Sequence, residues 1–228
     1  MSKNFFEIKD VTFAIGGKNK VNDVNISIKN EGDTICILGP SGIGKTTMLR
    51  TIAGLEKINK GEIILKDKVI SSDKIHIEPE KRNIALSFQE NSLFPHYSVD
   101  KNIHLGIKKN SQTDKNIDSK EIIKILNIED ILSKYPHQIS AGEAQRASLA
   151  RSLISQPDLL LLDEPLSNVD QSFKEDIQVA LKQLLNKNKI TTIVVTHDSY
   201  EAFYLGSKCA LVLDNEVKQF DDPYNVYH

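Results

Sequence analysis

The chain has only two cysteines, almost no excess of charge and no apolar run of membrane-spanning length among its 228 residues. Its longest apolar runs, such as Leu159–Leu162 and Ile193–Val195, fall far short of the roughly 18 to 20 residues that a spanning helix needs. Residues 1–10 lack the apolar segment of a secretory signal, and a net charge of −2 creates no general attraction to nucleic acid or acidic lipid. Cys36 and Cys209 lie in strand-like apolar runs, as small buried side chains of a reducing compartment do. We therefore expect a chain that neither crosses a membrane by itself nor binds nucleic acid.

Strands alternate with helices along the chain, which predicts an α/β core with a parallel sheet. We expect one domain over residues 1–228, with a helical subdomain inserted at about 90–155. The predicted strands are Phe5–Ile8, Val11–Phe13, Val24–Ile28, Thr34–Leu38, Asn83–Phe88, Asp158–Leu162 and Ile190–Thr196, with hairpins over 61–70 and Cys209–Phe220. The predicted helices are Lys45–Ala53, Glu143–Ser155 and Gln171–Asn186, with a helical stretch over Val99–Leu132 that contains a polar loop at Lys108–Lys120.

A glycine-rich stretch, Gly39–Thr46, follows a predicted strand and precedes a predicted helix. It fits the pattern G-x-x-x-x-G-K-[ST] in the structural context that this pattern requires. The glycines let backbone N–H groups close around phosphates, Lys45 can reach the β- and γ-phosphates, and the Thr46 hydroxyl can ligate Mg²⁺. We therefore predict a nucleoside triphosphate site made of Gly39, Pro40, Ser41, Gly42, Ile43, Gly44, Lys45, Thr46 and Thr47.

Two carboxylates, Asp163 and Glu164, end the buried strand Leu159–Leu162. Asp163 is placed to hold Mg²⁺ directly or through water, and Glu164 lies one residue further, where it can polarise an attacking water. Acidic residues after a strand also serve as helix caps, but beside a phosphate-binding loop the pair favours ATP hydrolysis over passive binding.

His197 follows the strand that ends at Thr196, where open α/β sheets place their ligand sites. A lone histidine there is often a cap or a core residue. We predict that His197 instead donates to the γ-phosphate and orients the attacking water together with Glu164.

A second helix start, at Ser140, has two compatible interpretations. Ser140-x-x-Glu143 is a capping box, which by itself only starts a helix well. The same start offers unpaired N–H groups and the positive end of the helix dipole to an anion. If both helix starts hold the same γ-phosphate, the second must come from another copy of the chain.

Together these motifs resemble the ATP-binding subunit of ABC transporters over nearly the whole chain. Ser87–Glu90 resembles the family's Q-loop, Ile139–Glu143 its signature motif, Ser167–Asp170 its D-loop and Thr196–Asp198 its H-loop. The resemblance implies a P-loop NTPase fold, the ABC cassette, with a RecA-like core, an N-terminal antiparallel β-subdomain and an inserted α-helical subdomain. It also implies ATP and Mg²⁺ as cofactors.

The resemblance further implies roles for the matching residues. Gln89 would be catalytic alongside Lys45, Glu164 and His197, would bind Mg²⁺ with Thr46 and Asp163, and would report to a membrane partner. Phe13 would stack on adenine. Two cassettes would sandwich two ATP molecules as a homodimer or a paired cassette, each contributing residues in trans to the other's site: Ser140, Ala141, Gly142, Glu143 and Asp170.

The chain departs from the common family pattern at four places. Ala141 replaces a glycine of the signature motif, Asn168-Val169 replaces Ala-Leu in the D-loop, Phe13 replaces tyrosine, and Ile139 replaces leucine. None of these changes removes a charge or a catalytic group. We therefore expect an active ATPase.

The segment Phe88–His96, followed by Asn102-Ile103, resembles importer subunits of the maltose, thiamine, iron and polyamine type. That resemblance implies an integral membrane permease docking near Gln89–His96, a solute-binding protein acting indirectly, and a peripheral location at the cytoplasmic face of the cell membrane. The sequence ends at His228, just after the expected core, as in short members without a C-terminal regulatory domain.

Other ABC classes remain as alternatives. An exporter or cell-division subunit is disfavoured only by the Phe94–His96 region. A soluble ABC ATPase of DNA repair or translation would carry a long coiled coil or a second cassette, which the sequence lacks. A non-catalytic cassette conflicts with the retention of Lys45, Asp163, Glu164 and His197.

Overall fold

A single mixed sheet organises the protein. The computed structural model describes residues 4–15, 19–88, 93–105, 107, 118–169 and 171–227. Ten strands follow the order β5-β4-β1-β2-β10-β9-β3-β8-β7-β6 across the sheet. Their bounds are β1 Phe6–Ile15, β2 Asn19–Ile28, β3 Thr34–Leu38, β4 Glu62–Leu65, β5 Lys68–Ser71, β6 Ile84–Ser87, β7 Leu159–Asp163, β8 Thr191–Thr196, β9 Lys208–Leu213 and β10 Glu216–Asp221.

The two ends of the sheet differ in strand direction. The strands β5, β4, β1 and β2 are antiparallel, whereas β3, β8, β7 and β6 are parallel. The hairpin β9–β10 joins the two parts, with β9 parallel to β3 and a single pair, Glu216 with Asn22, linking β10 to β2. The predicted α/β class with a parallel core is confirmed.

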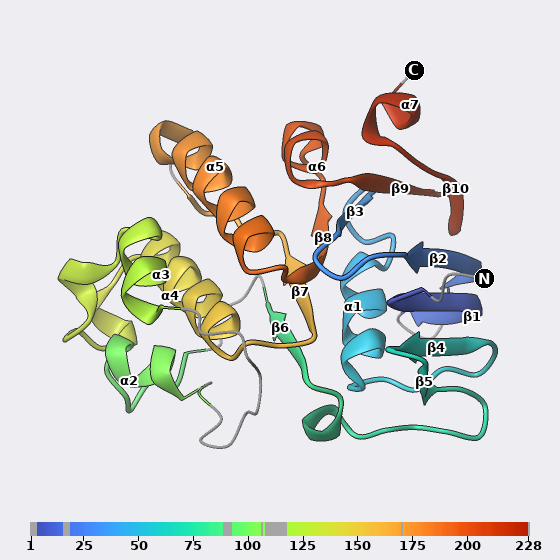
Figure 1. Ribbon diagram of the computed structural model, residues 1–228, viewed down its shortest axis with the longest axis horizontal. Coiled ribbons are helices and arrows are strands. Elements are labelled where there is room, and N and C mark those ends of the chain that lie inside the picture. The colour runs from blue at the N-terminus through green and yellow to red at the C-terminus, as the bar shows by residue number, and fades with distance from the viewer. Residues whose placement is uncertain are drawn as a thin grey trace.

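Helices lie on both sides of the parallel strands (Figure 1). The helix α1 lies on the side of the N-terminal strands and packs on β1, β6 and β7, whereas α4 packs on α2, α3 and β6. In Figure 1, α1 and α4 are separated by β6 and β7. The helix bounds are α1 Lys45–Ala53, α2 Val99–His104, α3 Ser119–Ile125, α4 Ala141–Ile154, α5 Gln171–Lys187, α6 Ser199–Leu205 and α7 Pro223–Tyr227.

The core explains why the central strands are apolar without alternation. Along β7, Leu159 and Leu161 pack in the cluster that holds the α1 and N-terminal strand side chains. Leu160 and Leu162 point to the other face and join the cluster of the α4 and α5 side chains. Because both faces of a parallel sheet are covered, every position of such a strand must be apolar.

The strands depart from prediction mainly in the first hairpin. Two predicted short strands merge into β1, which keeps its pairing with β2 through irregular register after Ile8, with Asp10 at φ 49°. The strand β2 also begins earlier than predicted, at Asn19 instead of Val24. The hairpins over β4–β5 and β9–β10 are confirmed, each with a two-residue turn of positive φ.

The helices depart from prediction in length and number. The stretch predicted as helical from Val99 contains the short helices α2 and α3 with a 3₁₀ turn at Glu129–Ile131. Residues 108–117 of the predicted polar loop lie outside the described residues, and its last two positions already belong to α3. The helix α4 begins at Ala141, two residues before the predicted start, and α6 and α7 were not predicted.

A buried arginine, Arg82, connects the end of α1 to the start of β6. Arg82, just before β6, is 3% exposed, and its guanidinium donates to the Ile52 carbonyl at 2.9 Å and to the Ser71 hydroxyl at 2.9 Å. The Ile52 carbonyl belongs to the last turn of α1, where intrahelical partners run out. Burial lowers the pKa of Arg82 to about 10, which leaves it charged at neutral pH. Gly54 lies against it, since a Cβ there would come within 2.4 Å of Arg82 Nε.

Replacing this arginine should cost stability. We expect Arg82→Met to lower the free energy of unfolding by about 3 kcal/mol, because buried carbonyls at the end of α1 lose a charged donor. Urea denaturation of purified protein measures this. Arg50→Met is the matched control, since the exposed Arg50 side chain pairs with the exposed Glu56 and its loss should change stability by less than about 1 kcal/mol. Equal losses in the two variants would contradict the role given to Arg82.

Candidate functional site

The loop between β3 and α1 has a backbone that requires glycine. Gly42 and Gly44 have φ of 80° and 108°, in the left-handed region that favours glycine. A Cβ on Gly39 would lie 2.6 Å from the Val212 carbonyl oxygen. The N-cap of α1 is Gly44, which has no side-chain cap, so the first N–H groups of the helix are left for an anion. The predicted phosphate-binding loop therefore has the conformation that its sequence demands.

Lys45, at the start of α1, is held inside this loop. Its side chain is buried, and Nζ donates to the carbonyl oxygens of Gly39 at 2.7 Å and Pro40 at 2.9 Å. Burial lowers the pKa of Lys45, and the nearby carboxylates of Glu164 and Asp163 oppose that shift. Neutral carbonyls orient the ammonium without cancelling its charge, so the lysine is placed to bind a phosphate.

Asp163 and Thr46 offer oxygen ligands beside the loop. Asp163 ends β7 with 4% of its surface exposed, and burial raises the pKa of its carboxyl, opposed by a hydrogen bond from the Thr46 side chain and by the charge of Lys45. A carboxylate next to a hydroxyl fits Mg²⁺, which takes few protein ligands and completes its shell with water and phosphate oxygens. Within the described ranges, no group of three or more His, Cys, Asp and Glu side chains could hold a metal by itself.

Glu164 and His197 meet at the ends of neighbouring strands. The Glu164 carboxylate lies 3.0 Å from His197 Nδ1, with side-chain exposures of 13% for Glu164 and 57% for His197. Glu164 has a φ of 47°, a strained value for a residue other than glycine, and its N–H donates to the Val195 carbonyl at 2.8 Å. The carboxylate and the imidazole that the sequence predicted to act together are therefore in contact.

The start of α4 has the predicted capping box. The Glu143 N–H donates to Ser140 Oγ at 3.2 Å, and the Ser140 N–H donates to Glu143 Oε2 at 2.7 Å. That second bond lowers the pKa of Glu143 more than any other contact. Ser140 and Ala141 are exposed, whereas Gly142 packs so closely that a Cβ would lie 2.5 Å from the Asn168 carbonyl oxygen. The helix start is thus well capped and still open to an anion from outside.

One predicted site residue needs correction. Phe13 was expected to stack on adenine, but it is 1% exposed and belongs to the core of the N-terminal strands. Alternation along β1 places Phe13 on the same buried face as Val11, where it pairs across to Val21 on β2. A ring packed in this way presents no face to a base.

Two further predicted residues cannot be placed. Gln89, expected in both the catalytic and the Mg²⁺ sets, and Asp170, expected to act in trans, lie outside the described residues. The structure also places a residue that was not predicted, the buried Gln145 of α4, against the Glu164 carbonyl.

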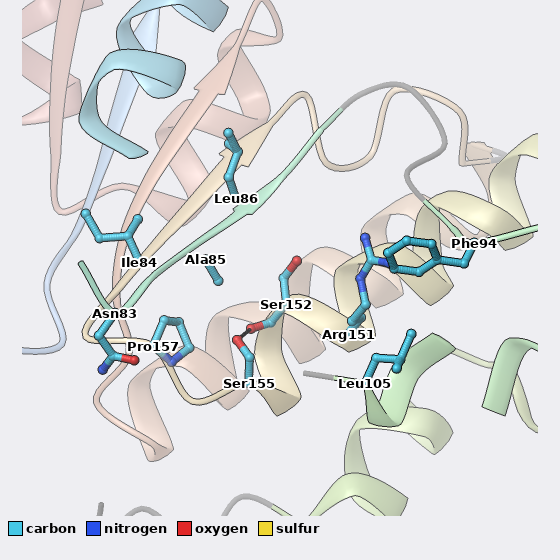
Figure 2. Close-up of a pocket in the computed structure, with 10 residues that line it drawn as sticks. All are labelled: Asn83, Ile84, Ala85, Leu86, Phe94, Leu105, Arg151, Ser152, Ser155 and Pro157. Atoms are coloured by element: carbon cyan, nitrogen blue, oxygen red, sulfur yellow. Dashed lines mark hydrogen bonds between the residues drawn. The ribbon is translucent and has the colours of Figure 1, made fainter. Parts of the chain in front are cut away.

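An open groove lies between β6 and α4 (Figure 2). Its volume is about 470 Å³, and Phe94 and Leu105 on its rim are 48% and 45% exposed. The Arg151 guanidinium lies 5.8 Å from the centre of the Phe94 ring. Buried Asn102 fixes this rim, since it accepts from the Phe94 N–H at 2.7 Å and donates to the Phe94 carbonyl at 3.0 Å. The groove lining comprises Asn83, Ile84, Ala85, Leu86, Phe94, Leu105, Arg151, Ser152, Ser155 and Pro157.

Comparison with known proteins gives consistent results. The family model described as ABC transporter matches residues 21–167. The Fe(3+) ions import ATP-binding protein FbpC of Fusobacterium nucleatum is 36% identical over all of this chain and 60% of its own length. The spermidine/putrescine import ATP-binding protein PotA of Thermotoga maritima is 39% identical over 96% of this chain and 59% of its own length. The chain thus spans about 60% of the length of these curated relatives.

Solved structures agree with the sequence relatives. A dimeric post-hydrolysis state of the ATP-binding cassette MJ0796, bound to ADP and Pi, superposes with a TM-score of 0.80 at 28% identity, covering 96% of this chain and 98% of that one. The structure of cbiO1 from Clostridium perfringens, part of the ABC transporter complex cbiONQ, gives 0.79 at 25% identity, covering 98% of this chain and 90% of that one. None of the helices in the described segments is both long and apolar enough to span a bilayer.

Proposed function

Because this chain belongs to the ABC transporter family of ATP-binding domains, we propose that it is the ATP-hydrolysing subunit of a membrane importer. One observation carries the proposal. The loop that cradles Lys45, the carboxylate of Asp163 and the contact between Glu164 and His197 all lie at the ends of the parallel strands β3, β7 and β8. That arrangement supplies a phosphate cradle, a metal ligand and a general base in one site.

Each residue then has a distinct part in the reaction. The N–H groups of the loop and the Lys45 ammonium bind the β- and γ-phosphates of ATP. Thr46, Asp163 and Gln89 would hold Mg²⁺, which would supply positive charge beside the phosphate oxygens. Glu164 accepts a proton from the attacking water, and His197 orients that water and donates to the γ-phosphate. The products are ADP and phosphate.

We propose that the complete site forms between two copies or between this chain and a paired cassette. Ser140, Ala141, Gly142, Glu143 and Asp170 of one copy complete the site that contains Lys45 of the other. The exposed, capped start of α4 supports this arrangement, and the neighbour MJ0796 is a dimer with ADP and Pi. Ala141 adds a methyl group at that contact without removing an N–H donor.

Phe94, which belongs to the segment Gln89–His96 expected to meet the permease, lines the groove between β6 and α4, and this groove is our proposed docking site for a permease. The half-exposed side chain of Phe94, whose backbone is held by Asn102, offers an apolar anchor for a permease segment. Docking there would hold the chain peripherally at the cytoplasmic face of the membrane, with a solute-binding protein acting indirectly. The names of the FbpC and PotA relatives favour import over an exporter or a soluble ATPase.

The test is Mg²⁺-dependent phosphate release by the purified chain. We expect removal of Mg²⁺ with excess EDTA to lower the rate by about 10²-fold or more, since the metal stabilises charge on the transferred phosphoryl group. The rate per molecule should also rise with protein concentration, because two copies form a site. Lys45→Ala is the control for contaminating phosphatase. Phosphate release that survives both EDTA and Lys45→Ala would contradict the proposal.

A further inference from the structure

A buried amide joins the start of α4 to the turn after β7. Gln145 is 3% exposed, and its Nε2 donates to the Glu164 carbonyl oxygen at 2.8 Å and to Ser167 Oγ at 3.2 Å. Its Oε1 accepts from the Asn168 N–H at 3.0 Å. One side chain of α4 thus holds Glu164 itself and two residues of the turn that follows it, Ser167 and Asn168.

The same turn also packs against the backbone of α4. A Cβ on Gly142 would lie only 2.5 Å from the Asn168 carbonyl oxygen, so no side chain fits between them. The amide of Gln145 has partners for both its oxygen and its nitrogen, and a buried polar group satisfied in this way specifies one arrangement of its surroundings. The start of α4 and the turn Glu164–Asn168 are therefore bound to each other as one unit.

Glu164 needs such support because its backbone is strained. With φ at 47°, the residue stays in place only if its neighbours hold it. Its N–H is fixed by the Val195 carbonyl of β8, and its carbonyl is fixed by Gln145. These two bonds clamp the peptide groups on both sides of the Cα that carries the carboxylate, and so set the direction in which it meets His197.

We infer that Gln145 is a positioning residue for Glu164 of the same chain, although it belongs to the helix whose start serves the partner's ATP. The inference rests on the proposed function. It follows that the helix contacting one ATP is tied directly to the base that acts on the other. A shift of α4 when the partner's phosphate binds would therefore move the Glu164 backbone through Gln145 and reposition its carboxylate.

The first test separates positioning from folding. We expect Gln145→Met to lower kcat by about 10- to 100-fold through misplacement of the base, with KM for ATP within about twofold of native. Gln178→Met on α5 is the matched control, since it replaces another buried amide outside the site and should retain kcat. A loss expressed in KM alone, or native kcat in Gln145→Met, would overturn the inference.

Mixed dimers then assign the effect to one of the two sites. In the first mixture, limiting Gln145→Met protein is combined with excess Glu164→Gln protein, so the only active base lies in the same chain as the changed residue. In the second, limiting native protein is combined with an excess of the double variant Gln145→Met/Glu164→Gln, so the active base lies opposite it. A reference mixture of limiting native protein and excess Glu164→Gln sets the one-site rate.

We expect the second mixture to match the reference and the first to be about 10- to 100-fold slower. Equal rates in the first and second mixtures, or a loss confined to the second, would overturn the inference. Both mixtures contain the Gln145→Met change, so a general folding defect gives equal rates. No hydrolysis in the reference mixture or by native protein would instead reject the proposed function.

Discussion

Glu164→Gln is expected to lower the rate of ATP hydrolysis by about 10³-fold while ATP binding is retained. The amide keeps the shape of the carboxylate but cannot take a proton from water. Glu164 is largely shielded from solvent and lies 3.0 Å from His197 Nδ1, whereas the Lys45 ammonium is held by the carbonyl oxygens of Gly39 and Pro40, which the change leaves in place. Binding should therefore survive, and dimers that bind ATP without turning over should accumulate.

Phosphate release and size-exclusion chromatography with ATP measure the two parts of this prediction. Glu216→Gln, an equivalent change at an exposed residue of β10, is the matched control and should leave both unchanged. Near-native hydrolysis by Glu164→Gln would remove this residue from the role of base. Loss of binding together with hydrolysis would mean that the change disturbs the loop around Lys45.

Ser140→Arg should lower hydrolysis by about 10²-fold or more without weakening ATP binding to the isolated chain. Ser140 is the exposed N-cap of α4, and its Oγ accepts the Glu143 N–H at 3.2 Å. Arginine would fill the space that a partner's phosphate must enter and would also remove the cap. The helix α1, which begins at Lys45, lies on the other side of β6 and β7 from α4 (Figure 1), so the change should leave the loop around Lys45 intact.

Ser140→Ala separates the two effects of that change. It removes the cap, at a cost of about 1 kcal/mol in stability, but leaves room for the phosphate. We expect Ser140→Ala to retain much of the native rate and Ser140→Arg to lose it, with fluorescent nucleotide binding native in both. If the two variants hydrolyse ATP equally well, the start of α4 is only a helix cap.

Features with a short-range cause were predictable from the sequence. The loop at Gly39–Thr46 needs glycines for its own backbone, the capping box at Ser140 spans four residues, and the unbroken apolar run Leu159–Leu162 marks β7 as a buried strand. The helix α6 was missed although it carries a signal, since Asp198 caps it and accepts the Tyr200 N–H at 2.9 Å. The same aspartate is both the last residue of the H-loop match and the N-cap of α6.

Features with a long-range cause were not predictable. The face of β1 that receives Phe13 depends on pairing with β2, so an aromatic residue in this strand does not by itself indicate a nucleotide contact. Gln145 resembles any polar residue of a helix, and its role appears only when folding brings it to the Glu164 carbonyl, 19 residues away in the chain. Arg82 likewise reaches the end of α1, 30 residues earlier.

The central claim is that one copy of the chain is an incomplete enzyme. Its most direct test mixes Ser140→Arg protein with Lys45→Ala protein, each inactive alone. A mixed dimer has one site with both Lys45 and Ser140 intact, so we predict phosphate release well above the sum of the two variants measured separately. If no ratio of the two proteins exceeds that sum, the site is not shared between copies and the account is wrong.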